Sequence, residues 1–131
     1  MSQENVELAR AYFDAFDRGD LQQAASFLDE DVEWNNFALI DEERLRGRKA
    51  VLEYWERVLA AFPFEHEDHE FIESGGQVCV LVRIRAKGPK SGVEPPPIHS
   101  GYALTLRDAQ VIRSDFFPDR ATALKAVGLA E

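Results

Sequence analysis

Hydrophobic residues near the start of the chain recur at the spacing of an α-helix. Four of them fall on one face of such a helix: Ala9, Tyr12, Phe13 and Phe16. This pattern predicts a helix over residues 3–18, which Gly19 ends because glycine readily adopts the left-handed conformation of a helix terminus. Asp20, with Gln23 three residues later, is typical of a helix start and predicts a short second helix to Leu28.

The longest stripe of hydrophobic positions lies in the middle of the chain, over residues 48–62. Its members repeat every three or four residues: Val51, Trp55, Val58 and Phe62. Pro63 lacks a backbone N–H and cannot continue a helix, so this helix is predicted to end before it. The basic segment "RLRGRK" at residues 44–49 follows "DEE" and is expected to form a solvated loop.

Strands are predicted on both sides of this helix. "DVEWNNF" at residues 31–37 alternates in polarity with a period of two, and four further strands are predicted at residues 64–73, 78–87, 99–107 and 111–117. The last two are separated only by "RDA", which predicts a hairpin. The segment "PDRATALKAVGL" predicts a short helix that is capped by Asp119 and ended by Gly128.

Helices followed by a run of strands predict the α+β class, with the helices on one face of a curved antiparallel sheet. The segment "VCVLV" at residues 78–82 is hydrophobic at every position, so both of its faces must be covered. The helices cover one face, and a second copy of the chain is the simplest cover for the other. We therefore expect a homodimer formed through the outer sheet face.

The composition narrows the class of protein. With 131 residues, 45% of them hydrophobic, the chain is expected to form one domain over residues 1–131. No long hydrophobic run or secretory signal is seen, so a cytoplasmic protein is expected. With 15 basic and 24 acidic residues the net charge is −9, which disfavours nucleic acid and membranes as partners. The single cysteine, Cys79, is expected to be a buried, inert thiol.

Three segments together resemble a known family: "ENVELARAYFDAFDRGDLQQAASFLDEDVEW", "LRGRKAVLEYWERV" and "TLRDAQVIRSDFFPDRATALKAVGL". In this order they are similar to the SnoaL-like branch of the nuclear transport factor 2-like superfamily, to which ketosteroid isomerase also belongs. The resemblance covers essentially the whole chain. It implies a cone-shaped α+β barrel in which a strongly bent sheet wraps the long helix. It also implies a pocket at the wide end and dimerisation through the outer sheet face.

The isomerase branch implies which positions of this chain belong to a site. Its catalytic tyrosine corresponds to Tyr12, and its supporting tyrosine corresponds to Trp55. Its general-base carboxylate corresponds to Asn36, within one residue. Its protonated carboxylic acid corresponds to Tyr102, or to His99 if the loop is aligned without a gap. Because an amide cannot abstract a proton, this comparison disfavours steroid-isomerase chemistry with Asn36 as the base.

The candidate catalytic residues are therefore Tyr12, Asn36, Tyr102 and His99. The candidate ligand-binding residues are those expected on the walls of a hydrophobic pocket: Phe16, Trp34, Trp55, Leu104, Ser114 and Phe116. Each type also has a simpler interpretation. A buried tyrosine or tryptophan can be ordinary core, an asparagine can bond the loop at a strand end, and a loop-end histidine can be exposed.

The other histidines give no sign of a metal site. His66 and His69 are three residues apart on a predicted strand, which would place them on opposite faces. With no third ligand nearby in the sequence, neither a metal nor another cofactor is expected. The run "EHEDHE" at residues 65–70 is interpreted as the solvated face of an edge strand.

Two functions remain open at this point. The chain can bind a small cyclic or aromatic ligand in a hydrophobic pocket, with general-acid isomerase, cyclase or hydrolase chemistry. Alternatively, it is a non-catalytic dimeric ligand-binding or association module whose cavity is packed shut. An open cavity of at least about 300 Å³ would favour the first function.

Overall fold

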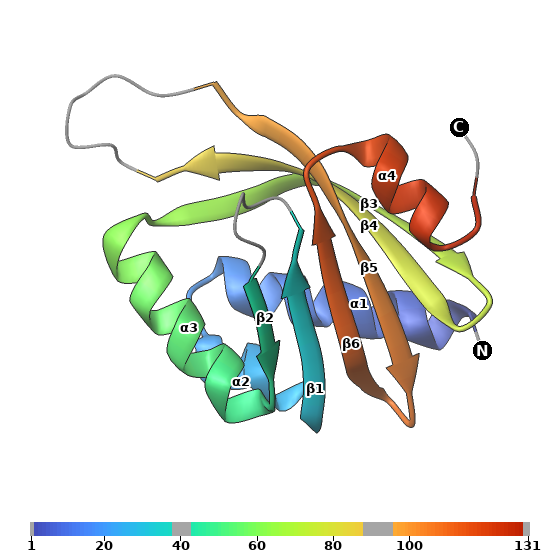
Figure 1. The fold of residues 1–131 in the computed structure, drawn as a ribbon, viewed down its shortest axis with the longest axis horizontal. Helices are drawn as coiled ribbons and strands as arrows, with labels where there is room; N and C mark the ends of the chain where they lie inside the picture. Colours follow the sequence, from blue (N-terminus) through green and yellow to red (C-terminus); the bar gives the residue numbers. More distant parts are fainter. Residues whose placement is uncertain (1, 38–42, 88–95, 130–131) are drawn as a thin grey trace.

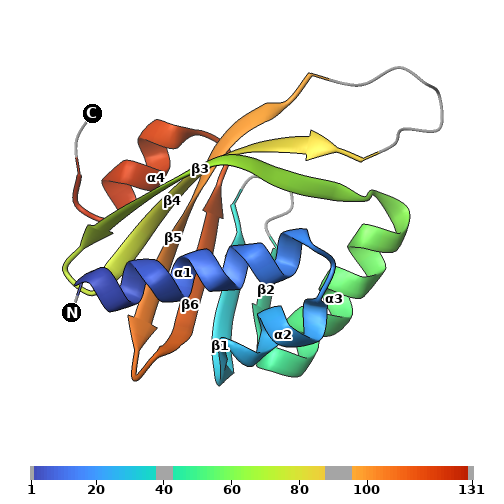
Figure 2. The same cartoon turned by 180° about the vertical axis from the view of Figure 1, so that it is seen from behind.

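A curved, open sheet of six strands forms the centre of the molecule, with helices on both faces (Figures 1 and 2). The computed structural model describes residues 2–37, 43–87 and 96–129. The helices are α1 (Ser2–Asp17), α2 (Leu21–Ser26), α3 (Arg48–Ala61) and α4 (Arg120–Ala126). The strands are β1 (Leu28–Asn36), β2 (Glu43–Arg46), β3 (Phe64–Ser74), β4 (Gln77–Ala86), β5 (Ile98–Arg107) and β6 (Gln110–Phe117). The predicted α+β class is confirmed.

The strands lie in the order β2-β1-β6-β5-β4-β3. All neighbours are antiparallel except β1 and β6, so the predicted curved antiparallel sheet contains one parallel pair. In the chain, α3 and four strands (β2, β3, β4 and β5) separate β1 from β6, so the connection is long enough for the two strands to run parallel. Trp34 on β1 lies opposite Ser114 on β6, which brings the two ends of the chain into one sheet.

Local signals placed most helix ends correctly. Asp20 accepts a hydrogen bond from the backbone N–H of Gln23 at 3.1 Å, as a helix cap does, and the predicted cap at Asp119 accepts one from Thr122 at 2.8 Å. The second helix is shorter than expected, because Leu28 already belongs to β1.

The segment predicted as a loop at residues 44–49 contains most of β2 and the start of α3. Leu45 pairs with Trp34 of β1 and is the only hydrophobic residue of the four in β2. A short edge strand with a single hydrophobic residue carries too little alternation to be recognised in the sequence.

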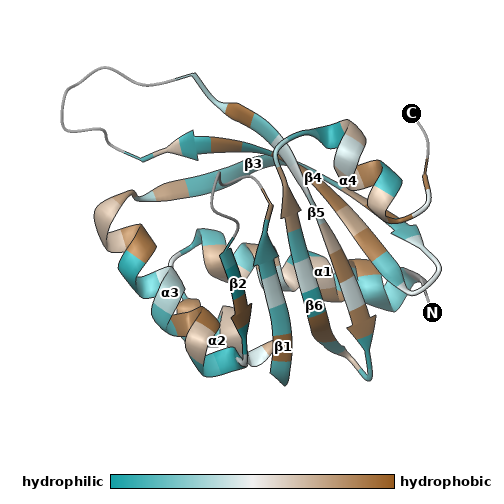
Figure 3. Ribbon diagram, viewed as in Figure 1, coloured by the Kyte–Doolittle hydropathy of each residue, from teal (hydrophilic) through white to brown (hydrophobic). Residues whose placement is uncertain are grey.

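The helices divide between the two faces of the sheet. In Figure 2, α1 crosses the inner face, and Figure 1 shows α4 on the opposite face, beside β4 and β5. Beneath α4, Cys79 and Leu81 of β4 and Ala103 of β5 pack against Ala123 and Val127. Figure 3 shows the hydrophobic run of β4 next to this helix.

This packing explains why β4 is hydrophobic on both faces. The outer face of "VCVLV" is covered by α4 of the same chain, so the argument that it needs a second copy was wrong. The homodimer itself stays a prediction. Within the described ranges, none of the helices is long and apolar enough to span a membrane.

The contact between α4 and β5 leads to a testable prediction about stability. A Cβ atom added at Gly101 would lie 2.5 Å from the Cβ of Ala123, closer than two carbon atoms can pack. Gly101→Ala should therefore lower the free energy of unfolding by about 1–3 kcal/mol in urea titrations. Ala123→Gly in the same chain removes the clash, so the two changes together should destabilise less than their sum. Strictly additive effects would show that α4 does not press on Gly101.

Candidate functional site

A hydrophobic cavity of about 190 Å³ lies between α1, α3 and the inner face of the sheet. Fourteen described residues line it: Tyr12, Phe13, Phe16, Trp34, Asn36, Tyr54, Trp55, Val58, Leu59, Phe64, His66, Ile84, Tyr102 and Phe116. The volume is below the roughly 300 Å³ that would have favoured the ligand-binding enzyme over the association module, so that criterion is not met. The volume is comparable to cavities of about 150 Å³ that hold a single benzene ring. The cavity is therefore sized for a molecule of about one ring.

The structure brings seven of the ten predicted site residues into this lining: Tyr12, Phe16, Trp34, Asn36, Trp55, Tyr102 and Phe116. Leu104 and Ser114 face the same side of the sheet but are fully buried in the core and do not line the cavity. His99 is exposed, pairs with Arg83 and also lies outside the lining. Of the two positions left open by the family comparison, only Tyr102 reaches the cavity.

Aromatic rings in mutual contact make the walls of the cavity. The ring of Trp55 lies 5.1 Å from that of Phe16, in an edge-to-face arrangement, and 6.1 Å from that of Tyr12. On the sheet side, Tyr102 and Phe116 are 4.7 Å apart. Rings packed against one another in this way have few alternative rotamers, so the cavity is preformed and its polar groups are held in place.

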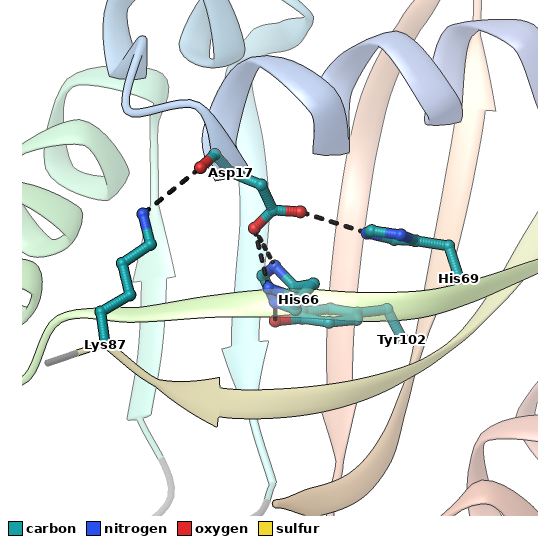
Figure 4. A network of polar contacts seen from close by, with 5 residues as sticks. All are labelled: Asp17, His66, His69, Lys87 and Tyr102. Carbon is teal, nitrogen blue, oxygen red and sulfur yellow. Dashed lines mark hydrogen bonds and ion pairs between the residues drawn. The ribbon is translucent and has the colours of Figure 1, made fainter.

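A chain of hydrogen bonds runs from the end of α1 to Tyr102, which lines the cavity (Figure 4). The carboxylate of Asp17 accepts hydrogen bonds from the backbone N–H of His66 at 2.9 Å and from its ring Nδ1 at 2.8 Å, both at Oδ1. The other ring nitrogen of His66, Nε2, lies 2.7 Å from the hydroxyl of Tyr102. The side chain of His66 is only 2% exposed. A carboxylate, an imidazole and a hydroxyl are thus joined in one buried row.

His69 bonds to the same carboxylate, with its Nε2 3.1 Å from Oδ2 of Asp17. The expectation that His66 and His69 point to opposite faces was wrong. The pairing of β3 with β4 shifts between Glu67 and Glu70, where Asp68 has a positive φ of 51°. This bulge inserts an extra residue and turns both imidazoles toward α1.

The interpretation of residues 65–70 as a solvated face was also wrong, because His66 in this run is buried. Each imidazole meets a different oxygen of Asp17. In the described part of the chain, no group of three His, Cys, Asp or Glu side chains is placed to hold a metal ion.

The hydrogen bonds decide the charge of Asp17. Burial alone raises the pKa of this carboxyl group, but the bonds from His66 and His69 outweigh burial and lower its pKa to about 2. Burial raises the pKa of the Tyr102 phenol well above its ordinary value. At neutral pH, the row therefore consists of an ionised carboxylate, an imidazole and a neutral phenol.

Tyr12 supplies a second hydroxyl to the cavity. Tyr12 is 5% exposed, and burial raises the pKa of its phenol, with no hydrogen bond to a described residue to offset that effect. Asn36 lines the cavity, whereas Asn35 points to the other face and donates to Asp115 at 2.7 Å. A buried phenol with no acceptor among the described residues is available to donate to a ligand.

Sequence reasoning missed Asp17 and His66. The signal for His66 was its parity: it alternates with Glu65 and Glu67 and shares the inward side of β3 with Phe64. No local pattern marks Asp17, because it ends α1 and meets its partners 49 and 52 positions away.

The model of the SnoaL-like domain family matches residues 9–114 of the chain. The chain belongs to the SnoaL-like family. Residues 9–114 contain the whole cavity lining except Phe116, together with Asp17 and His69. Among curated proteins, none matches this SnoaL-like chain with significant similarity.

Solved structures share its fold at low sequence identity. A proposed polyketide cyclase from Xanthomonas campestris is 23% identical, with a TM-score of 0.74 over 88% of this chain and 90% of that one. TerC, co-crystallised with polyporic acid, is 21% identical, with a TM-score of 0.76 over 95% and 97% of the two chains. A proposed ketosteroid isomerase from Kribbella flavida is 21% identical, with a TM-score of 0.75 over 92% and 81%. These likenesses establish the nuclear transport factor 2-like fold.

The lowered pKa of Asp17 predicts how stability depends on pH. The pKa of Asp17 in the folded state, about 2, is below the ordinary value of 3.8 expected for the unfolded chain. The ionised carboxylate therefore stabilises the fold above about pH 4. This stabilisation is lost as the pH falls toward 2. Asp17→Asn should lower the free energy of unfolding by about 2 kcal/mol at pH 7, and the difference from the unmodified protein should shrink below pH 4.

Urea titrations at several pH values measure this difference. Glu56→Gln, at an exposed position of α3, removes the same charge and is the matched control. If both substitutions had the same effect at every pH, the bonds of Asp17 to the imidazoles would not contribute to stability.

Proposed function

We propose that this SnoaL-like protein binds a small, neutral, cyclic or aromatic ketone and moves a proton between its carbon and oxygen atoms. The observation that carries the proposal is the buried row of Asp17, His66 and Tyr102, which ends in a hydrophobic cavity that Tyr12 also lines. A carboxylate, an imidazole and a hydroxyl in this order form a general acid–base unit in many enzymes.

In this proposal the phenol of Tyr12 donates to the ligand's carbonyl oxygen. Tyr102 takes a proton from the adjacent carbon while it passes its own proton to Nε2 of His66. The resulting imidazolium is stabilised by the ionised carboxylate of Asp17, which stays charged throughout. Return of the proton to another atom of the ligand completes an isomerisation, and attack of the enol on a second carbonyl would give cyclase chemistry.

The position of the base is the main difference from the expectation drawn from the sequence. Asn36 lines the cavity, and an amide there cannot act as a base. Proton abstraction does not require Asn36, because His66, on β3 rather than β1, provides a basic ring nitrogen beside Tyr102. Asn36 is left to orient the ligand.

The lining also limits the class of ligand. The described lining residues include aromatic and aliphatic side chains, three phenols, one amide and one imidazole, but no Lys, Arg, Asp or Glu. A charged ligand would therefore lose its hydration without gaining a countercharge. A neutral molecule with one ring and one or two oxygen atoms is the best match.

A non-catalytic binding protein is the second candidate. The absence of a carboxylate from the described lining favours it, since the row of Asp17 and His66 then serves only to fix Tyr102. Binding without turnover of any ketone would support this alternative.

Binding to the cavity can be tested with phenol and cyclohexanone as probes. Tyr12→Phe removes one hydrogen bond and should weaken their binding about fivefold, with little change in the free energy of unfolding. Trp55→Ala should weaken probe binding and also lower the free energy of unfolding, because removal of a buried tryptophan costs about 3–5 kcal/mol. Fluorescence of Trp34 and Trp55 reports binding in the Tyr12 variant, and ligand-observed NMR reports it in both. Equal loss of stability in the two variants would show that Tyr12 is structural.

Catalysis can be tested by hydrogen exchange at carbon. In D₂O the protein should accelerate the replacement of the α-hydrogens of cyclohexanone, measured by loss of their proton NMR signals. Tyr102→Phe should reduce the protein-dependent rate by about 10²–10⁴-fold, the usual contribution of an acid–base group. His99→Gln, at an exposed position outside the cavity, should leave it unchanged. A rate that does not exceed that of buffer would exclude catalysis and leave the binding function.

A further inference from the structure

Because of the hydrogen bond to Asp17, only one nitrogen of the His66 imidazole can gain or lose a proton. The carboxylate accepts from both the backbone N–H and Nδ1 of His66, and it stays ionised, so Nδ1 keeps its hydrogen. Any gain or loss of a proton at this ring therefore occurs at Nε2, the nitrogen 2.7 Å from Tyr102.

The direction of the bond between His66 and Tyr102 depends on that proton. When the imidazole is neutral, Nε2 carries a lone pair, so the phenol of Tyr102 must donate to it and offers only its oxygen lone pairs to the cavity. When the imidazole is protonated, Nε2–H donates to the phenol oxygen. The hydrogen of Tyr102 is then free to turn toward a ligand.

The ring of His66 lies between the hydrophobic cavity and an open groove. Its ring is enclosed by Phe13, Phe16 and Phe64 at ring-centre distances of 5.1–5.5 Å. Outside, Asp17, His66 and His69 also line an open groove of about 600 Å³, through which protons can reach the ring. The titratable or charged groups that share the groove or cavity with it are Arg10, Tyr12, Asp14 and Asp17 of α1, Tyr54 of α3, His69 of β3 and Tyr102 of β5. The ammonium group of Lys87 reaches the backbone oxygen of Asp17 at 3.4 Å.

We infer that His66 sets the hydrogen-bonding polarity of Tyr102 and thereby selects the class of ligand. With neutral His66, the site favours ligands that donate a hydrogen bond, such as enols, phenols and alcohols. With protonated His66, it favours ligands that only accept, such as ketones. The inference rests on the proposed function, because it concerns the ligand of the same cavity. His66 acts here as a positioning residue for Tyr102.

Two probes of the same size and neutral charge test this inference. Cyclohexanone only accepts hydrogen bonds, whereas cyclohexanol also donates. Their dissociation constants are measured by NMR titration between pH 5 and 8.5, in protein labelled with ¹⁵N at histidine. The same samples report the protonation of His66 at Nε2, with the three histidine signals assigned from His69→Gln and His99→Gln. As His66 gains its proton, binding of the ketone relative to the alcohol should strengthen about fivefold.

Variants separate this mechanism from a general effect of pH. In His66→Gln and in Tyr102→Phe the ratio of the two dissociation constants should no longer depend on pH, whereas in His99→Gln the dependence should persist. A constant ratio in the unmodified protein while His66 titrates, or a His66 that does not titrate in this range, would overturn the inference alone. If neither probe bound at any pH, the proposed function would fail together with it.

Discussion

The interaction on which the site depends is the bond between the carboxylate of Asp17 and the imidazole of His66. Asp17 is the last residue of α1, and His66 lies near the start of β3, so the bond ties the end of the helix to the edge of the sheet. A buried imidazole without partners would be costly, and so would a buried carboxylate. Each satisfies the other, and the pair leaves one nitrogen directed at Tyr102 in the cavity.

The rest of the fold holds this bond in a nonpolar setting. The bulge at Asp68 lets β3 present His66 and His69 to one carboxylate, and α3 closes the cavity with Trp55. The walls of the cavity are mostly hydrophobic, so hydrogen bonds inside it are electrostatically stronger than at the surface. The polar row and the hydrophobic walls therefore depend on each other.

One fold can support several kinds of chemistry, because the sheet and helices position a cavity without specifying the groups in it. In this chain, an amide occupies the cavity at Asn36, on β1, while the carboxylate-backed imidazole enters from β3. The candidate base has therefore a different origin in the sheet from the one that the family comparison suggested. Similarity of fold alone would not have revealed this change.

The sequence by itself determined the elements whose signals are local. The periodicity of α1 and α3, the caps at Asp20 and Asp119 and the inward parity of Tyr102 and Phe116 all follow from neighbours within a few positions. Only the tertiary structure decided the parallel pairing of β1 with β6, the cover of β4 by α4, and the meeting of Asp17 with both imidazoles. These features depend on residues far apart in the chain and on a bulge, and one inserted residue reverses every inside–outside assignment that follows it.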